Sequence, residues 1–343
     1  MPLFLLYFAR VIRELRLPLP DDFHVHLRQG EPLKAYARDL SKTFGRALVM
    51  PNTLPPITSA KAILAYKAEI LEAAPTLEPL MTFKLRAGYS EHEILSMKEA
   101  GAVAGKYYPA GVTTNSQDGI SDLETVLPVL SLMEKFGLVL CVHGEEPSAF
   151  CLDREAAFIK TIERLAAEFP RLRIVFEHLS TAAAVEAVLK MPGTVAATLT
   201  VHHLVTTLDD VLGGSFRPHL FCKPLPKRPE DRAAIRRAAF SGNPKFFFGS
   251  DSAPHARAQK ECACCAAGVY TAPVALPVLA REFEGAAALD KLPNFIGGFG
   301  ADFYGLPRPK RTITLRREPW VAPAEAGGAV PLAAGETLEW RVA

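Results

Sequence analysis

The chain has 343 residues, a length typical of a single α/β barrel. Hydrophobic residues make up 49% of it and charged residues 22%, so it can bury a large core and is not disordered. Thirty-nine Lys and Arg against 37 Asp and Glu leave a formal net charge of +2, which argues against nucleic-acid binding. No apolar run approaches the roughly 18 uncharged residues that a membrane span needs. We therefore expect neither a nucleic-acid nor a membrane partner.

The N-terminal segment and the cysteines both indicate a cytoplasmic protein. Arg10, Arg13 and Arg16 follow the Leu- and Phe-rich start, whereas a signal peptide carries its positive charge before the apolar stretch. The cysteine spacing resembles no disulfide framework. The cluster Cys262-Ala-Cys264-Cys265 lacks a second pair at zinc-finger spacing, and we interpret its thiols as incidental rather than as a structural zinc site. The remaining cysteines are Cys141, Cys151 and Cys222.

Short β-rich runs alternate with stretches of helical periodicity along most of the chain. The predicted strands are 23–26, 47–52, 77–84, 102–107, 138–144, 173–178, 195–203 and 245–251. The predicted helices are 32–42, 60–74, 91–100, 122–136, 154–169, 182–191 and 229–240. Ser90 with Glu93, and Ser121 with Glu124, have the spacing of a capping box at a helix start.

This alternation predicts an α/β fold, a TIM (β/α)8 barrel of eight parallel strands. A doubly wound open sheet is the main rival, but it favours a glycine-rich phosphate turn after its first strand. The first strand here ends in His-Val-His, and the sequence contains neither GxGxxG nor GxxxxGK[ST]. We expect one domain over 1–343, with a barrel core at about 19–305. The extension at about 306–343 is expected to cover the barrel bottom or to pair with the N-terminal segment.

Polar residues follow the predicted strands, at the end of a barrel where active sites lie. His24 and His26 are two residues apart, so on a strand both imidazoles face the same side. A pair of buried, hydrogen-bonded histidines would give the same pattern. His143, His178 and Asp251 end other predicted strands, however, and imidazoles with a carboxylate suit zinc. The pattern therefore indicates a metal site at the barrel mouth.

Lys106 ends the run Ala-Val-Ala-Gly-Lys, where an ammonium group is costly to bury unless it is paired or chemically changed. A salt bridge to Asp251 or Glu145 is the simpler interpretation. The alternative is that the neutral amine takes up CO2 to give a carbamate that bridges two metals. The spacing alone does not distinguish these two states.

The chain resembles the dihydroorotase family of the amidohydrolase superfamily, in its bacterial short-chain type, from about residue 19 to 342. The motifs that carry the resemblance are Asp21-Asp22-Phe-His-Val-His-Leu-Arg28, Met50-Pro-Asn-Thr53, Gly105-Lys-Tyr-Tyr-Pro109, Thr113-Thr-Asn-Ser116, Val142-His-Gly-Glu145, Glu177-His-Leu-Ser-Thr181, Arg217-Pro-His-Leu-Phe-Cys222 and Gly249-Ser-Asp-Ser-Ala-Pro-His255. Together they are highly specific, whereas any one alone would not be.

The resemblance implies two zinc ions per subunit, bridged by an N6-carboxylated Lys106. The implied metal ligands are His24, His26, Lys106, His143, His178 and Asp251. The implied substrate contacts are His26, Arg28, Asn52, Thr113, Thr114, His143, Lys223, His255 and Ala267. Among these, Thr113 and Thr114 resemble a mobile-loop pair that closes over the substrate, and Lys223 and Ala267 would act through main-chain groups. Lys223 replaces an expected apolar residue, a change that a backbone contact should survive.

The implied reaction is the reversible cyclisation of N-carbamoyl-L-aspartate to L-dihydroorotate in de novo pyrimidine biosynthesis. A hydroxide between the metals would be the nucleophile, because zinc lowers the pKa of bound water toward about 7. Asp251 would be the catalytic residue, acting as general base and acid. Two zinc ions against a carbamate, a carboxylate and a hydroxide leave a charge of about +1, which favours an anionic substrate. The resemblance also implies a homodimer.

Three alternatives differ from this interpretation in the residues they require. Another cyclic amidase, such as a hydantoinase, dihydropyrimidinase or allantoinase, would not need the carboxylate pocket of Arg28, Asn52 and His255. A non-catalytic scaffold would be expected to lose metal ligands, and a one-metal deaminase would dispense with the lysine. His202 and His203 end the predicted strand 195–203, but the resemblance does not use them as ligands, so we interpret them as supporting or structural residues.

Overall fold

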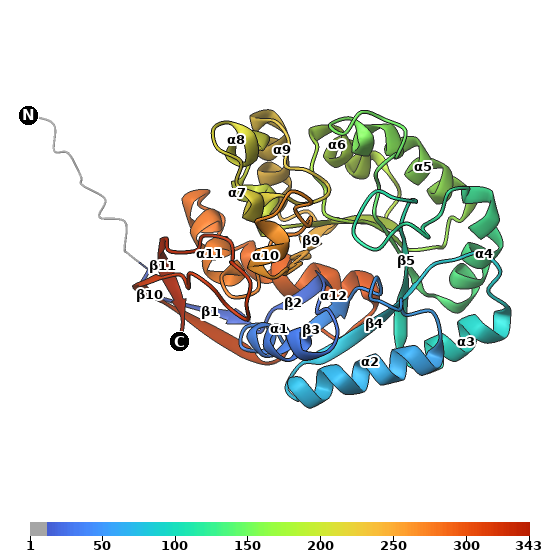
Figure 1. Ribbon diagram of the computed structural model, residues 1–343, viewed down its shortest axis with the longest axis horizontal. Helices are drawn as coiled ribbons and strands as arrows, with labels where there is room; N and C mark the ends of the chain where they lie inside the picture. Colours follow the sequence, from blue (N-terminus) through green and yellow to red (C-terminus); the bar gives the residue numbers. More distant parts are fainter. Residues whose placement is uncertain (1–11) are drawn as a thin grey trace, which may run out of the picture.

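The computed structural model describes residues 12–343 and contains a barrel of parallel strands surrounded by helices (Figure 1). Most of the apolar start of the chain, on which the cytoplasmic prediction rests, lies outside these residues. The barrel strands run in chain order around the ring. They are β2 (Asp21–Val25), β3 (Arg46–Val49), β4 (Glu78–Lys84), β5 (Ala102–Tyr107), β6 (Val139–Val142), β7 (Ile174–Phe176), β8 (Val195–Leu199) and β9 (Phe246–Phe248).

The first and last strands of the ring meet and close the barrel. The Asp251 amide donates to the His24 carbonyl at 2.9 Å, and the His26 amide donates to the Ser252 carbonyl at 3.0 Å. All other neighbours pair in parallel register. The predicted TIM barrel is therefore confirmed, and its closure brings two segments more than 220 residues apart to one point.

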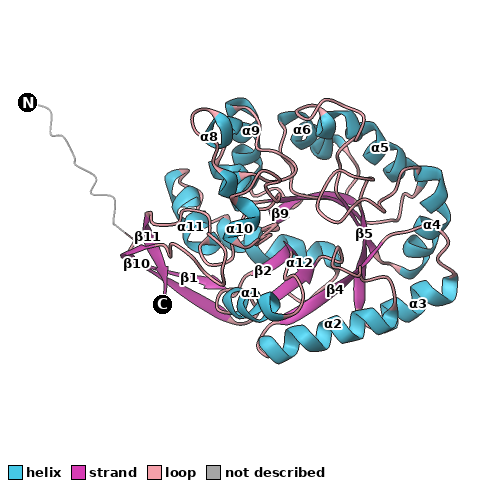
Figure 2. Ribbon diagram, viewed as in Figure 1, coloured by secondary structure: helices cyan, strands magenta, loops and turns pink. Residues whose placement is uncertain are grey.

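Helices cover the outside of the ring, as Figure 2 shows. The helices of the described chain are α1 (Glu31–Ser41), α2 (Ala60–Ala73), α3 (Glu91–Glu99), α4 (Leu127–Phe136), α5 (Arg154–Glu168), α6 (Ala182–Lys190), α7 (Val201–Val205), α8 (Leu208–Leu212), α9 (Pro229–Phe240), α10 (Arg257–Lys260), α11 (Ala275–Gly285) and α12 (Phe299–Tyr304), with short helical turns at η1 (Leu123–Val126), η2 (Pro218–Leu220) and η3 (Asn294–Gly298). Among the described residues, no helix is both long and apolar enough to span a bilayer.

Two apolar clusters hold these layers together. The larger one lies between the strands and the surrounding helices. The smaller one fills the barrel interior, where Phe23 stacks on Tyr304 with ring centroids 5.0 Å apart and meets the Phe247 ring edge-on at 5.4 Å. Because Tyr304 comes from α12, this helix closes the amino-terminal end of the barrel. The opposite end, where the strands finish, remains available for the polar residues.

The structure corrects two predicted local features. The predicted strand 195–203 ends at Leu199, because Thr200 accepts the His203 amide and begins α7. His202 and His203 therefore lie on a short helix instead of a strand end.

The capping box at Ser90 and Glu93 is confirmed. The one predicted at Ser121 is wrong, since the side chain of Asp122 caps the following turn.

A second sheet links the two ends of the described chain. It consists of β1 (Glu14–Pro18), β10 (Thr312–Val321) and β11 (Thr337–Val342), all antiparallel. The pairing of β1 with β10 confirms the expectation that the C-terminal region pairs with the N-terminal segment. The buried Trp340 anchors β11, and its indole N–H donates to Glu284 of α11 at 3.1 Å.

Candidate metal centre and substrate pocket

Three potential ligand atoms meet where β2 and β9 end. His24 Nε2 lies 3.4 Å from His26 Nε2 and 3.4 Å from Asp251 Oδ1, and His26 Nε2 lies 3.2 Å from Asp251 Oδ1. Atoms bound to one tetrahedral zinc at about 2.0–2.2 Å are separated by about 3.3–3.5 Å. The spacing of this triangle therefore fits a single cation bound by all three side chains.

A second pair of imidazoles lies beside this triangle. His143 Nδ1 is 3.2 Å from His178 Nε2, and the His24 and His178 rings have centroids 5.1 Å apart. Burial lowers the pKa of His24 and of His178 well below 6.5, so both rings are neutral and able to act as ligands. The buried His178 Nδ1 has no hydrogen-bond partner in the structure. This donor set suits a second cation, because neutral imidazole nitrogens are good zinc ligands.

Lys106 is fully buried between these groups, and it contacts Glu177. The salt bridge predicted with Asp251 or Glu145 is therefore wrong, because the buried Glu177, the residue after β7, contacts the Lys106 ammonium instead. Burial lowers the pKa of Lys106 to about 7. A substantial fraction of the amine is thus neutral near pH 7, and the neutral form is the one that can take up CO2.

Two carboxylates that orient this cluster were not predicted from the sequence. Glu177 Oε2 lies 2.9 Å from His24 Nδ1, and the other ring nitrogen of His24 faces Asp251. Asp22 accepts the amides of His24 and Ser250 at 3.1 and 2.8 Å and the Ser250 hydroxyl at 2.5 Å. Glu177 directly precedes the predicted ligand His178, and Asp22 lies two residues before the predicted ligand His24. That proximity is the only signal the sequence offers.

The backbone at the strand ends is strained where the predicted ligands and substrate residues lie. His178 and Asp251 both have φ of 44°, and Arg28 has φ of 62°. Non-glycine residues rarely adopt this left-handed conformation, which is concentrated at functional sites. The turn after each strand thus aims the side chain into the barrel mouth.

Arg28 and His255 form a cationic corner next to the triangle. Arg28 Nε donates to the Pro254 carbonyl at 2.8 Å, and its terminal nitrogen lies 2.9 Å from His255 Nε2. Burial, and then the charge of Arg28, lower the pKa of His255 to about 3, so this ring is neutral. His255 Nε2 is also 3.0 Å from the Ala267 carbonyl. The fork of Arg28 is well suited to a carboxylate.

A loop after β5 covers this corner. The Asn52 amide donates to the Thr114 carbonyl at 3.1 Å, and the Asn115 side chain donates back to the Asn52 carbonyl at 2.9 Å. The Thr114 hydroxyl lies 3.4 Å from the Ala267 carbonyl. The space that remains is about 20 Å³, room for about one water molecule. It is lined by His26, Arg28, Asn52, Thr113, Thr114, Lys223, Asp251, Ala253, Ala267 and Gly268.

An outer cavity of about 530 Å³ adjoins this space and shares Arg28 and Thr114 with it. With the loop in this position, the inner space next to the predicted ligands is far smaller than the outer cavity. The loop thus covers the inner space in this structure, and the closing role expected for Thr113 and Thr114 stays a prediction.

His202 and His203 lie outside the cluster of predicted ligands. His203 Nδ1 is 2.8 Å from the Thr200 hydroxyl, and its Nε2 is 3.1 Å from the Pro224 carbonyl. With both nitrogens engaged, His203 has a structural role. His202 is also fully buried, and its nitrogens come within 4.8 Å of His203 and Cys222.

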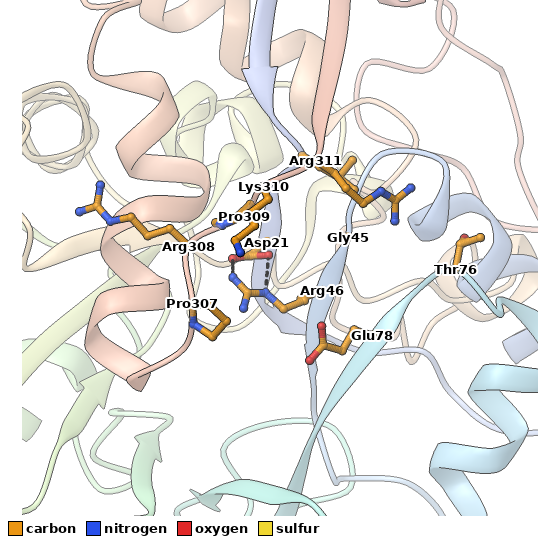
Figure 3. Close-up of a pocket in the computed structure, with 11 residues that line it drawn as sticks. Asp21, Gly45, Arg46, Thr76, Glu78, Pro307, Arg308, Pro309, Lys310 and Arg311 are labelled. Atoms are coloured by element: carbon orange, nitrogen blue, oxygen red, sulfur yellow. Dashed lines mark hydrogen bonds and ion pairs between the residues drawn. The ribbon is translucent and has the colours of Figure 1, made fainter.

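A further cavity of about 420 Å³ lies at the opposite end of the barrel (Figure 3). Arg46 forms two hydrogen bonds with Asp21 there, at 2.9 and 2.5 Å. None of the predicted site residues lines this cavity. Active sites of TIM barrels lie at the carboxyl ends of the strands, so we infer that the functional site is the cluster of predicted metal ligands.

Comparison with known proteins identifies the family of the chain. Residues 22–315 match the Amidohydrolase family. A dihydroorotase of Teredinibacter turnerae is 47% identical over 338 residues, 96% of this chain and 98% of that protein. The structure of a Campylobacter jejuni dihydroorotase is 40% identical, with a TM-score of 0.89 over 96% of this chain and 97% of that one. The dihydroorotase of Saccharomyces cerevisiae, solved with 5-fluoroorotic acid, is 34% identical, with a TM-score of 0.92 over 97% and 99%.

The barrel, its cluster of potential metal ligands and the match over residues 22–315 identify an amidohydrolase, and the chain belongs to that family. Within it, the chain is a member of the dihydroorotases, as the motifs predicted.

Proposed function

We propose that this protein catalyses the zinc-dependent, reversible interconversion of N-carbamoyl-L-aspartate and L-dihydroorotate in de novo pyrimidine synthesis. The proposal rests on one observation. The potential metal ligands His24, His26 and Asp251 lie next to the cationic corner formed by Arg28 and His255. Metal ligands alone would suit many hydrolases. A guanidinium fork beside them specifies a substrate that carries a carboxylate.

Two zinc ions would be held by the six predicted ligands. His24, His26 and Asp251 would hold one ion, and His143 with His178 the other, with a carboxylated Lys106 between them. When bound, the metals would polarise the amide carbonyl and lower the pKa of water. Glu177 keeps the Nε2 atom of His24 directed at its metal position.

Asp251 would carry the proton that the reaction must move. Although burial alone would raise the pKa of its carboxyl, the hydrogen bond from His26 helps to lower that pKa well below its ordinary value, so the carboxyl is ionised. In the proposed reaction this carboxylate would accept the proton from the attacking water. As the bond between the carbonyl carbon and the ring nitrogen breaks, Asp251 returns that proton to the nitrogen.

Arg28, Asn52 and His255 would bind the carboxylate of the substrate, and the loop with Thr113 and Thr114 would exclude water once the substrate is bound. Main-chain groups at Lys223 and Ala267 line the same space and are available to the substrate ring. The expected homodimer and cytoplasmic location stay predictions.

The test compares an anionic with an uncharged cyclic amide. Zinc-reconstituted protein is mixed with L-dihydroorotate or with hydantoin, and ring opening is followed by ultraviolet absorbance. We expect turnover of L-dihydroorotate and little turnover of hydantoin. The reverse preference would identify a hydantoinase-like cyclic amidase, and zinc binding without turnover of either would indicate a non-catalytic relative.

A further inference from the structure

Lys260, at the end of α10, is a buried lysine bonded to backbone carbonyls. Its side chain is 2% exposed. The Nζ atom donates to the carbonyls of Phe221, Ala266 and Gly268 at 2.9, 2.8 and 2.8 Å. An ammonium group has three N–H donors, so this lysine is fully satisfied without a carboxylate partner. Its positive charge is therefore not neutralised by an ion pair.

These carbonyls belong to two segments that Lys260 ties together. Phe221 lies two residues before Lys223, and Ala266 and Gly268 lie on either side of Ala267. The Gly268 amide donates to the Phe221 carbonyl at 2.9 Å and joins the same segments directly. Lys260 thus holds both neighbours of Ala267 at fixed positions.

The same two segments form one wall of the inner cavity beside the metal cluster. Lys223 and Ala267 both line it. The Ala267 carbonyl lies 3.0 Å from His255 Nε2 and 3.4 Å from the Thr114 hydroxyl. A Cβ atom on Gly268 would lie 2.4 Å from the Ala253 carbonyl oxygen. The wall is therefore packed too closely to shift without moving the pocket.

We propose that Lys260 is a positioning residue for substrate recognition. It fixes the peptide groups at Lys223 and Ala267 so that they face the substrate ring, and its uncompensated charge favours an anionic ligand. It does not touch the reacting atoms and acts through the backbone that it holds. This inference rests on the proposed function, because it concerns recognition by the same site.

The experiment replaces Lys260 in three graded ways. Lys260→Met removes all donors and the charge, Lys260→Gln keeps two donors, and Lys260→Arg keeps the charge. Lys245→Met is the matched control, since Lys245 Nζ also donates to backbone carbonyls, of Val188 at 2.9 Å and of Met191, but it lies before β9, away from the site. Each variant is assayed for zinc content, for KM and kcat with L-dihydroorotate, and for the Kd of 5-fluoroorotate.

For Lys260→Met we expect KM and the 5-fluoroorotate Kd to rise by about tenfold or more, which corresponds to losing about 1.4 kcal/mol of binding. Zinc content and kcat should change little, and the effect should decrease from Met through Gln to Arg. Lys245→Met should keep the KM and Kd of the unaltered protein.

Three results would overturn the inference. One is an unchanged KM and Kd in folded Lys260→Met or Lys260→Gln, while the unaltered protein is active. Another is an equal rise in Lys245→Met, which would show a general effect of destabilisation. The third is failure of all three Lys260 variants to fold and bind zinc, because the lysine would then be purely structural. If the unaltered protein neither turns over L-dihydroorotate nor binds 5-fluoroorotate, the proposed function fails first, and the inference fails with it.

Discussion

Glu177 Oε2 lies 2.9 Å from His24 Nδ1, in position to orient the ring whose Nε2 atom faces Asp251. Carboxylates that hold a ligating imidazole in this way contribute about 10- to 100-fold to metal affinity. Glu177→Gln should therefore weaken zinc binding by about that factor, measured by competition with a fluorescent chelator. Glu78→Gln, an exposed change at the other end of the barrel, is the control. Equal zinc affinity in the two variants would show that Glu177 does not orient the ligand.

Arg28 should determine the preference for a substrate carboxylate. Arg28→Met removes a partly buried cation that also bonds His255 and the Pro254 carbonyl. Truncating one partner of a buried charge pair costs about 2 kcal/mol or more, so KM for L-dihydroorotate should rise at least about thirtyfold. Steady-state kinetics measure this, with the exposed Arg86→Met as control. A KM within a factor of about two of the unaltered value would remove Arg28 from the proposed pocket.

The barrel interior should depend strongly on Phe23. This side chain is 1% exposed and packs against Phe247 and Tyr304. Phe23→Ala should lower the free energy of unfolding by about 3–5 kcal/mol, because it leaves a cavity that the ring of strands cannot close. Phe150, which is 67% exposed, provides the control Phe150→Ala. Denaturant unfolding of the two variants would reveal the difference, and equal losses would contradict the packing described.

Neutral buried histidines should make the metal-free protein sensitive to acid. Burial lowers the pKa of His202 to about 4, from 6.5 when exposed. Between these values the unfolded chain binds the extra proton, so stability falls as the pH drops through this window, by up to about 1.4 kcal/mol per pH unit. Both proteins are treated with a chelator to remove metal. Between pH 6.5 and 4.5, the free energy of unfolding of His202→Gln should then fall less steeply than that of the unaltered protein. Identical slopes would indicate that His202 is already protonated or exposed in the folded state.

Thiol reactivity should follow burial. Burial raises the pKa of Cys141 to about 11, and Cys222 is buried as well, whereas Cys262 and Cys264 are exposed. The thiolate is the reactive form. Brief alkylation at pH 8 should therefore label Cys262 and Cys264 and spare Cys141 and Cys222, as peptide mass spectrometry would detect. Labelling of Cys141 in folded protein would contradict the closed barrel interior.

The sequence predicted the barrel because each of the first seven predicted strands is followed by a helix with a clear period. Metal-ligand candidates could be recognised for the same reason, since strand ends of a parallel barrel converge at one face. His202 and His203 were misplaced because the cap at Thr200 converts the end of the predicted strand into a helix. Periodicity does not reveal such a local change, which depends on one hydroxyl and one amide.

Other parts of the site depend on contacts between distant segments. Asp22 bonds Ser250, 228 residues away, and Lys260 bonds Phe221, 39 residues away. The sequence also favoured Asp251 or Glu145 as the partner of Lys106, whereas the structure pairs it with Glu177. Which carboxylate reaches a buried ammonium is decided by how the strands are staggered, and a residue pattern does not specify that stagger.

We propose that this protein needs metal ions bound by the ligands at the barrel mouth to open the ring of an anionic cyclic amide. The most direct measurement follows L-dihydroorotate turnover before chelation, after removal of metal, and after return of zinc. The account predicts loss of turnover with the metal and recovery at about two zinc ions per chain. Turnover that persists in metal-free protein, or that is absent from protein holding two zinc ions, would contradict it.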